Sequence, residues 1–444
     1  MRVRSLSLLF AFATLASAGS QIKAGVARVS IGPRLPAGLA GSSGLTHPGE
    51  SASGDLRARA LAIDDEAGGR AVLVSVELRA IPRALSEMIA SDIMKALDLE
   101  RGQILIDFAG TRSAPPLPGP PPNLAPASVE ERRKIAEYTA GLSQSLVGLT
   151  TEALSNMQPA RIGIALGRVS FAANAPLRSA LSASNPAGPF DTTIPVLRVE
   201  TTGGKILAVA FGYAGRAATL DADSYAVSGD YAGIVADRVE RDFPGSVALA
   251  LRLCDGGQAP SPRGSTSLAN SHEVELATEV GRLLKSPMPA VAGPLRATLI
   301  ETSLAFSPIA RAELELESKS TDTIRSQWAR RLIAAYDARI ELRSMPYPVQ
   351  LIRFGKGFAL VALGGEPSAS YALKIRKLLS QENLVIAGGA NDAGYFVPDA
   401  DHPDSADADS ADSIVYSGLP GAFSSDTEER ILDAVKRAWN RVLK

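Results

Sequence analysis

Histidine and cysteine, the side chains that most often serve as nucleophiles, general bases or zinc ligands, are scarce in this chain of 444 residues. The single cysteine is Cys254, and the three histidines are His47, His272 and His402. His402 lies in the segment Asp399–Asp412, in which six of fourteen residues are aspartate. Carboxylates and an imidazole can together hold a cation, but the aspartates lack the fixed spacing of an EF-hand loop. We therefore interpret this segment as a solvated acidic loop, with His402 as a weak candidate metal ligand.

The other two histidines have simpler interpretations. His47 precedes Pro48 in a loop rich in glycine and serine, which indicates a solvated loop residue. His272 follows Ser271 where a helix is expected to begin, so we expect it to be exposed in the first helical turn. Cys254 has no second cysteine to pair with, which excludes an intramolecular disulfide.

The composition is that of a globular protein with a sizeable core. Hydrophobic residues make up 45% of the chain and charged residues 21%. The 46 lysines and arginines nearly balance the 47 aspartates and glutamates, for a net charge of −1. This balance offers no electrostatic reason to expect nucleic acid or an anionic membrane as a partner.

The first eighteen residues have the pattern of a secretory signal peptide. Arg2 and Arg4 precede the apolar run Leu6–Leu15, and small residues follow at Ala16–Ala18. We therefore expect cleavage after Ala18 and a secreted or periplasmic protein. Later segments contain no uninterrupted apolar run of about 18 residues, so we expect no transmembrane segment.

The elements that must position any site alternate between short β-rich runs and amphipathic helices. Strands are predicted over residues 70–77, 103–108, 160–172, 196–211, 246–253 and 350–363. Helices are predicted over residues 86–97, 129–156, 231–242, 272–284, 323–338 and 368–379. This order predicts an α/β fold with a sheet covered by helices. Glycines at 203–204 and 355–357 indicate tight hairpins inside two of the strand runs, so we expect a mixed sheet.

Side-chain signals mark two helix starts and one long loop. Ser128 with Glu131, and Ser425 with Glu428, have the spacing of a capping box. Seven prolines in residues 113–126 predict an extended loop that cannot join a sheet.

Five short segments, in this order, carry a resemblance to a known family. They are residues 24–33 (AGVARVSIGP), 59–65 (RALAIDD), 227–233 (VSGDYAG), 363–367 (LGGEP) and 390–395 (ANDAGY). Together they resemble motifs of the neutral/alkaline, non-lysosomal ceramidase family. The resemblance implies that residues 19–444 form one ceramidase-like α/β domain, with no room for the carboxy-terminal immunoglobulin-like domain of longer members.

The same resemblance implies a chemistry and shows where this chain departs from it. Family members are similar to zinc amidohydrolases that cleave the acyl amide of ceramide, with zinc held by histidines, a glutamate and a tyrosine. The present chain has Gly110 and Arg112 at the positions of the first two motif histidines, and Arg216 at the position of another. Glu366 and Tyr395 are what remain of the metal set.

An arginine has no lone pair to donate to a metal, so Arg112 and Arg216 cannot replace imidazole ligands. We expect no cofactor, or zinc only if other residues rebuild the site. Arg112 and Arg216 instead place positive charge where zinc charge would lie, with Glu366 as counter-ion. This predicts a ligand-binding site formed by Arg112, Arg216, Glu366 and Tyr395 for an anionic group or a lipid. A buried Arg–Glu pair that only keeps the site neutral is the structural alternative.

Catalysis by another route has weak candidates in Ser113 and Ser261, whose hydroxyls lie near family site positions without a base at matching spacing. The leading hypothesis is a secreted ceramidase-like protein whose zinc site is degraded and whose former active-site cleft binds a lipid or an anionic ligand. The alternative is an active N-acyl amide hydrolase that uses a different metal or base, such as His402.

Overall fold

The computed structural model describes residues 22–40, 49–118, 128–174, 190–219, 226–381, 383–400, 414–415 and 417–444. The strands of the larger sheet are β1 (Lys23–Ser30), β3 (Arg57–Asp64), β4 (Arg70–Val76), β5 (Ile104–Phe108), β6 (Gln158–Arg168), β8 (Thr193–Thr201), β9 (Ile206–Tyr213), β11 (Val247–Arg252) and β13 (Ala290–Val291). The smaller sheet contains β14 (Leu295–Ala305), β15 (Ser344–Phe354), β16 (Phe358–Leu363) and β18 (Leu384–Ala387). Short two-stranded pairs join β2 (Ser51–Ala52) to β10 (Ala226–Val227), β7 (Ala172–Asn174) to β12 (Gln258–Pro260), and β17 (Glu366–Pro367) to β19 (Phe396–Val397).

The larger sheet folds back on itself. Its strand order is β11-β9-β8-β6-β1-β3-β4-β5, with β13 also paired to β6. β1 and β6 pair at only two positions, Lys23 with Pro159 and Ala24 with Gln158, so the ladder is weakest there. The Ser75 hydroxyl of β4 donates to the Ala250 carbonyl of β11 at 2.6 Å. Strands near opposite ends of the order therefore lie against each other.

The smaller sheet closes the central core. β14 and β15 form a long antiparallel ladder from Leu295–Phe354 to Ala305–Ser344. Its apolar side chains join those of the folded large sheet in one cluster that includes Leu61, Leu249 and Leu360. Side chains of both sheets thus share a buried interior, which supplies the main hydrophobic stabilisation.

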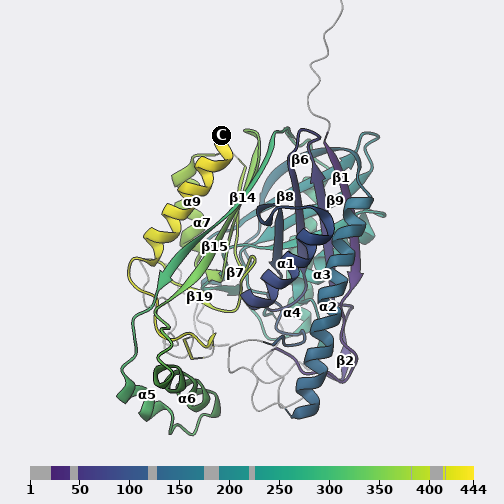
Figure 1. Ribbon diagram of the computed structural model, residues 1–444. Coiled ribbons are helices and arrows are strands. Elements are labelled where there is room, and N and C mark those ends of the chain that lie inside the picture. Colours follow the sequence, from purple (N-terminus) through teal and green to yellow (C-terminus); the bar gives the residue numbers. More distant parts are fainter. Residues whose placement is uncertain are drawn as a thin grey trace, which may run out of the picture.

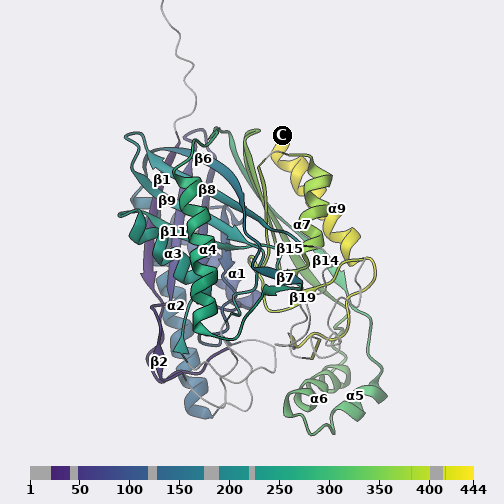
Figure 2. The same ribbon diagram turned by 180° about the vertical axis from the view of Figure 1, so that it is seen from behind.

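The helices other than α5 and α6 cover the outer faces of these sheets, as Figures 1 and 2 show from opposite sides. They are α1 (Arg83–Leu97), α2 (Val129–Ser155), α3 (Asp230–Asp242), α4 (Thr266–Leu284), α5 (Arg311–Glu317), α6 (Thr323–Asp337), α7 (Ala369–Leu379) and α9 (Thr427–Leu443), with a 3₁₀ turn η1 at Arg101–Gln103. α1 and α2 pack on β1, β3 and β4, and α3 and α4 pack on the β9–β11 side. α7 and α9 cover the smaller sheet, while α5 and α6 form a small apolar cluster of their own. The amphipathic spacing of α9, with Ile431, Val435 and Ala438 buried, is the reason it lies flat on a sheet.

The predicted α/β fold with a mixed sheet is confirmed. Both hairpins form, with Gly204 at φ 85° and Gly355 at φ 47° in their turns. The Ser128–Glu131 capping box is also present. The second predicted box is wrong, because α9 begins after Asp426, whose side chain makes no cap. The strand β14 had not been predicted, because polar residues interrupt its apolar pattern.

Several predictions fall on residues outside the described ranges. These are the signal peptide, most of the proline-rich and aspartate-rich segments, His47 and His402. None of the helices in the described part of the chain combines the length and the apolar character that a bilayer crossing requires.

Candidate functional site

The carboxyl ends of three parallel strand pairs meet at one place. The pairs are β4 with β5, β9 with β11, and β16 with β18. Isolated bridges Asp107–Ala390 and Leu253–Ala387 join the ends of these pairs across the two sheets. Loops that follow such ends commonly carry the ligand-binding residues of α/β proteins.

Four arginines gather here around one carboxylate, and we call Arg79, Arg112, Arg216 and Arg252 the guanidinium cluster. Arg252 Nη2 lies 3.4 Å from one oxygen of Glu366, and Arg216 Nε lies 3.7 Å from the other. Arg79 and Arg112 also interact electrostatically with Glu366. The structure therefore brings together Arg112, Arg216 and Glu366, three of the four predicted ligand-binding residues.

The charges of the cluster perturb each other's protonation. Burial disfavours the charged Glu366 carboxylate, but Arg252 and Arg216 outweigh it and lower its pKa to about 2. Burial, followed by the repulsion of Arg79 and Arg216, lowers the pKa of the Arg112 guanidinium to about 10. Like charges are thus held close together in a poorly solvated place, which is typical of sites that bind a counter-charge.

Arg252, at the end of β11, is the best-anchored member of the cluster. Its Nε donates to Asp255 at 2.7 Å, and its backbone N–H donates to Asp107 Oδ2 at 2.8 Å. A Cβ added at Gly110, which has φ 80°, would lie 3.2 Å from the Arg252 Cζ. The guanidinium of Arg252 therefore fills the space that a side chain at position 110 would enter.

Arg216 differs from Arg252 in its hydrogen bonding. It is 4% exposed, and within the described residues none of its three guanidinium nitrogens has a hydrogen-bond partner. Its hydrogen bonds are those of the backbone: its N–H donates to the Gln258 carbonyl at 3.3 Å, and its carbonyl accepts from the Ala218 N–H at 2.8 Å. A buried guanidinium with an ion-pair neighbour but no hydrogen bond is costly.

The segment Ser228–Tyr231 holds the loops that carry Arg112 and Arg216. The Ser228 N–H donates to the Ser113 carbonyl at 2.8 Å, and the Thr111 hydroxyl donates to the Ser228 carbonyl at 2.7 Å. On the other side, the Tyr231 hydroxyl donates to the Gly215 carbonyl, one residue before Arg216. These bonds set the relative position of the two arginine loops.

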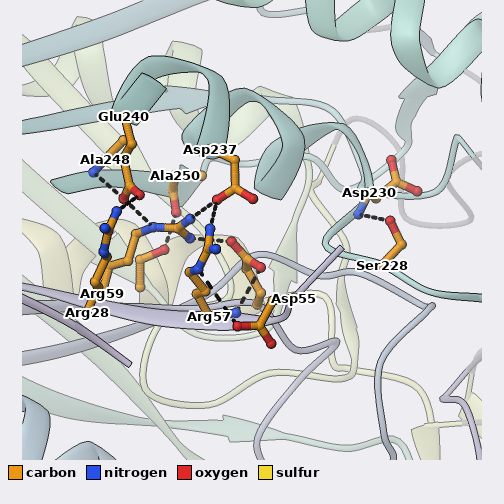
Figure 3. A network of polar contacts seen from close by, with 12 residues as sticks. Arg28, Asp55, Arg57, Arg59, Ser228, Asp230, Asp237, Glu240, Ala248 and Ala250 are labelled. Atoms are coloured by element: carbon orange, nitrogen blue, oxygen red, sulfur yellow. Dashed lines mark hydrogen bonds and ion pairs between the residues drawn. The ribbon is translucent and has the colours of Figure 1, made fainter. Parts of the chain in front are cut away.

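Helix α3 begins within the segment Ser228–Tyr231, and a network of ion pairs holds this helix against strands β1 and β3. Figure 3 shows Arg28, Arg57 and Arg59 reaching from the strands toward Asp237 and Glu240 on the helix. Arg59 is almost fully buried, and its Nε donates to Glu240 at 2.8 Å. In contrast to Arg216, each of its guanidinium nitrogens has a carboxylate partner, the third being Glu77.

Other predicted site residues lie apart from the cluster. The Tyr395 hydroxyl donates to Asp392 Oδ2 at 2.9 Å. The link between Tyr395 and Glu366 is through the backbone, where the Tyr395 carbonyl accepts from the Glu366 N–H. Ser113 is buried in the loop that Ser228 holds. Ser261 is exposed, and its N–H donates to the Phe171 carbonyl at 2.7 Å. None of these three hydroxyls has a histidine partner among the described residues.

The prediction that His272 is exposed at a helix start was wrong. α4 begins at Thr266, where Ser265 accepts from the Leu268 N–H at 3.2 Å. His272 therefore lies inside the helix and is 5% exposed. Its Nε2 is 2.7 Å from the Pro262 carbonyl oxygen, and its ring stacks on Phe171 at 4.5 Å.

Sequence reasoning missed Arg79, Arg252 and Asp255. Arg252 ends β11 directly after an apolar run, and Arg79 follows the end of β4 after Glu77 and Leu78. A charged residue at the end of an apolar strand is a weak signal, because it also describes an ordinary solvent-exposed strand end.

Comparison with solved structures gives this architecture two ceramidase neighbours. The crystal structure of neutral ceramidase from Pseudomonas aeruginosa has a TM-score of 0.70 and 14% identity, over 95% of this chain and 75% of that chain. A ceramidase complexed with C2 has a TM-score of 0.71 and 15% identity, over 95% and 76% of the two chains. The chain has a ceramidase-like fold. No family model and no curated protein matches the sequence, and structural similarity at these identities shows the fold alone.

The zinc implied by the ceramidase resemblance does not fit the residues at the expected positions. Gly110 has no side chain, and Arg112 and Arg216 have no lone pairs to donate. Within the described residues, no three histidine, cysteine, aspartate or glutamate side chains gather into a metal-binding group. The guanidinium groups gathered around Glu366 are instead hydrogen-bond donors for anions.

Proposed function

We propose that this chain is a secreted ceramidase-like protein whose guanidinium cluster binds an anionic group of a lipid or small molecule. We further propose that zinc-dependent amide hydrolysis has been lost, because the donors at the expected metal positions are replaced by glycine and arginine. The protein would then act by binding, through the cluster and Glu366.

The observation that carries this proposal is the hydrogen bonding of Arg216. Its guanidinium is buried, and its three nitrogens have no acceptor among the described residues. The nearest Glu366 oxygen is 3.7 Å from Arg216 Nε, and the carboxylate is shared with Arg252. Glu366 therefore does not supply the hydrogen-bond acceptors that the Arg216 guanidinium lacks. A carboxylate, sulfate or phosphate can accept two parallel N–H bonds from one guanidinium, which would offset the desolvation of the arginine.

Thermal unfolding with added anions tests the binding. Sulfate at ten times its dissociation constant should stabilise the wild-type protein by about 1.4 kcal/mol. Arg216→Met should abolish this increment. Arg198→Met is the matched control, since Arg198 is a half-buried arginine of β8 that donates to the Leu284 carbonyl, away from the cluster. An equal sulfate effect in wild type and Arg216→Met would refute binding at the cluster.

Zinc content and hydrolysis of a fluorogenic ceramide, measured on the same purified sample, test the loss of catalysis. We expect neither stoichiometric zinc nor turnover. Zinc together with turnover would overturn the proposal and would favour an active N-acyl amide hydrolase with other ligands, such as His402. Mutation of His402 to alanine would then identify whether this residue takes part.

A further inference from the structure

The guanidinium cluster has a surplus of positive charge. The ionised carboxylates beside it do not neutralise all four arginines. All four arginines interact electrostatically with the Glu366 carboxylate. The Asp255 carboxylate forms a second ion pair, in which it accepts a hydrogen bond from Arg252 Nε at 2.7 Å. Two carboxylates against four guanidiniums leave a surplus of two positive charges. Arg263 lies at the edge of this group and adds further positive potential at Arg112.

A third carboxyl group, Asp107, does not cancel the surplus. It is fully buried, and its Oδ1 has no hydrogen-bond partner in the described part of the chain. Its Oδ2 accepts the backbone N–H of Arg252, and the burial of the carboxyl group outweighs the attraction of the Arg252 charge. Burial raises the pKa of Asp107 well above its usual range, which favours the neutral acid.

The unsatisfied groups of the two central arginines are all donors. They are the three nitrogens of Arg216 and Nη1 of Arg252, each buried and without a partner among the described residues. Both side chains converge on the two oxygens of Glu366, so their unsatisfied donors lie near the same carboxylate. A ligand that satisfies them needs several acceptor oxygens and no donor.

Building on the proposed function, we infer that the guanidinium cluster selects a doubly charged tetrahedral oxyanion, a phosphate monoester, over singly charged anions. A phosphate monoester presents three terminal oxygens and carries close to two negative charges at pH 7.5. It therefore matches both the charge surplus and the number of free donors. A carboxylate or a sulfate monoester carries one charge and leaves half of the surplus in place.

Isothermal titration with methyl phosphate, methyl sulfate and acetate tests the selection. The two methyl esters share shape and differ in charge, so we expect methyl phosphate to bind about tenfold more tightly than methyl sulfate. Methyl phosphate loses its second charge near pH 6, so its affinity should fall about fivefold from pH 7.5 to pH 5 if the monoanion binds about tenfold more weakly than the dianion. Inorganic sulfate keeps both charges over this range and controls for titration of Asp107, Asp255 and Glu366.

Two single-charge variants test the role of the surplus. Arg112→Met removes one positive charge and should lower the methyl phosphate to methyl sulfate affinity ratio about fivefold. Glu366→Gln removes one negative charge and should raise this ratio. Circular dichroism of both variants verifies the fold. If both variants fold and the ratio of methyl phosphate to methyl sulfate affinity is unchanged, the surplus of positive charge does not select the dianion, and the inference is wrong.

The outcomes separate this inference from the proposed function. Equal affinities for all three probes, each lost in Arg216→Met, would leave an anion site but overturn the preference for a dianion. Absence of binding by any probe would overturn the proposed function itself. Dioctanoyl phosphatidic acid distinguishes the two sources of a phosphate monoester. Tighter binding than methyl phosphate supports a lipid headgroup, and equal binding supports a free phosphate ester.

Discussion

Replacing Arg216 by methionine should make the unliganded protein more stable. The Arg216 side chain is buried, its guanidinium has no hydrogen bond in the described structure, and the guanidiniums of Arg79 and Arg112 repel it. Glu366 keeps Arg252 at 3.4 Å after the change, so no carboxylate is left unpaired. Hydrophobic replacement of such buried ions typically raises the free energy of unfolding by about 1–4 kcal/mol. We expect a gain in this range.

Urea denaturation in a chloride buffer measures this free energy, with Trp328 and Trp439 as fluorescence reporters. Arg59→Met is the matched control, because Arg59 is equally buried but bonded to Glu77 and Glu240. This variant should lose about 3–5 kcal/mol, since it leaves carboxylates buried without a partner.

Opposite signs for the two substitutions are the expected result. Sulfate should then stabilise the wild-type protein and leave Arg216→Met unchanged. If Arg216→Met is destabilised as strongly as Arg59→Met, Arg216 is a satisfied structural residue, and the reasoning behind the anion site fails.

Three further predictions concern the surroundings of the cluster. Burial raises the pKa of Asp392 to about 7 in spite of the Tyr395 hydroxyl, so the native state binds more protons than the unfolded state between about pH 4 and 7. The unfolding free energy should therefore fall by about 2.5 kcal/mol from pH 5 to 8, and urea titrations of Asp392→Asn should lack this component. Gly110→Ala should cost about 1–3 kcal/mol, measured by the same method, because φ is 80° and the new Cβ would meet Arg252; an unchanged midpoint would contradict this geometry. Tyr231→Phe leaves the Gly215 carbonyl without its hydroxyl donor, so calorimetry should show about tenfold weaker sulfate binding; unchanged affinity would mean that this bond does not position the Arg216 loop.

The sequence by itself determined the fold class, and it led to the prediction that the expected metal donors are missing. Alternating β-rich and amphipathic runs predicted the α/β fold, since periodicity reports which side of an element is buried. Gly110, Arg112 and Arg216 are incompatible with imidazole-type ligation, because donor chemistry depends on residue type alone.

Only the tertiary structure decided which charged groups surround Glu366. Arg79 and Arg252 join the cluster because folding of the large sheet brings the ends of β4 and β11 together, and no local pattern encodes that approach. The Tyr395 hydroxyl bonds to Asp392, and His272 is buried because α4 begins six residues before the predicted start. Burial and pairing of a charged side chain depend on residues distant in sequence, so they emerge only when the chain has folded.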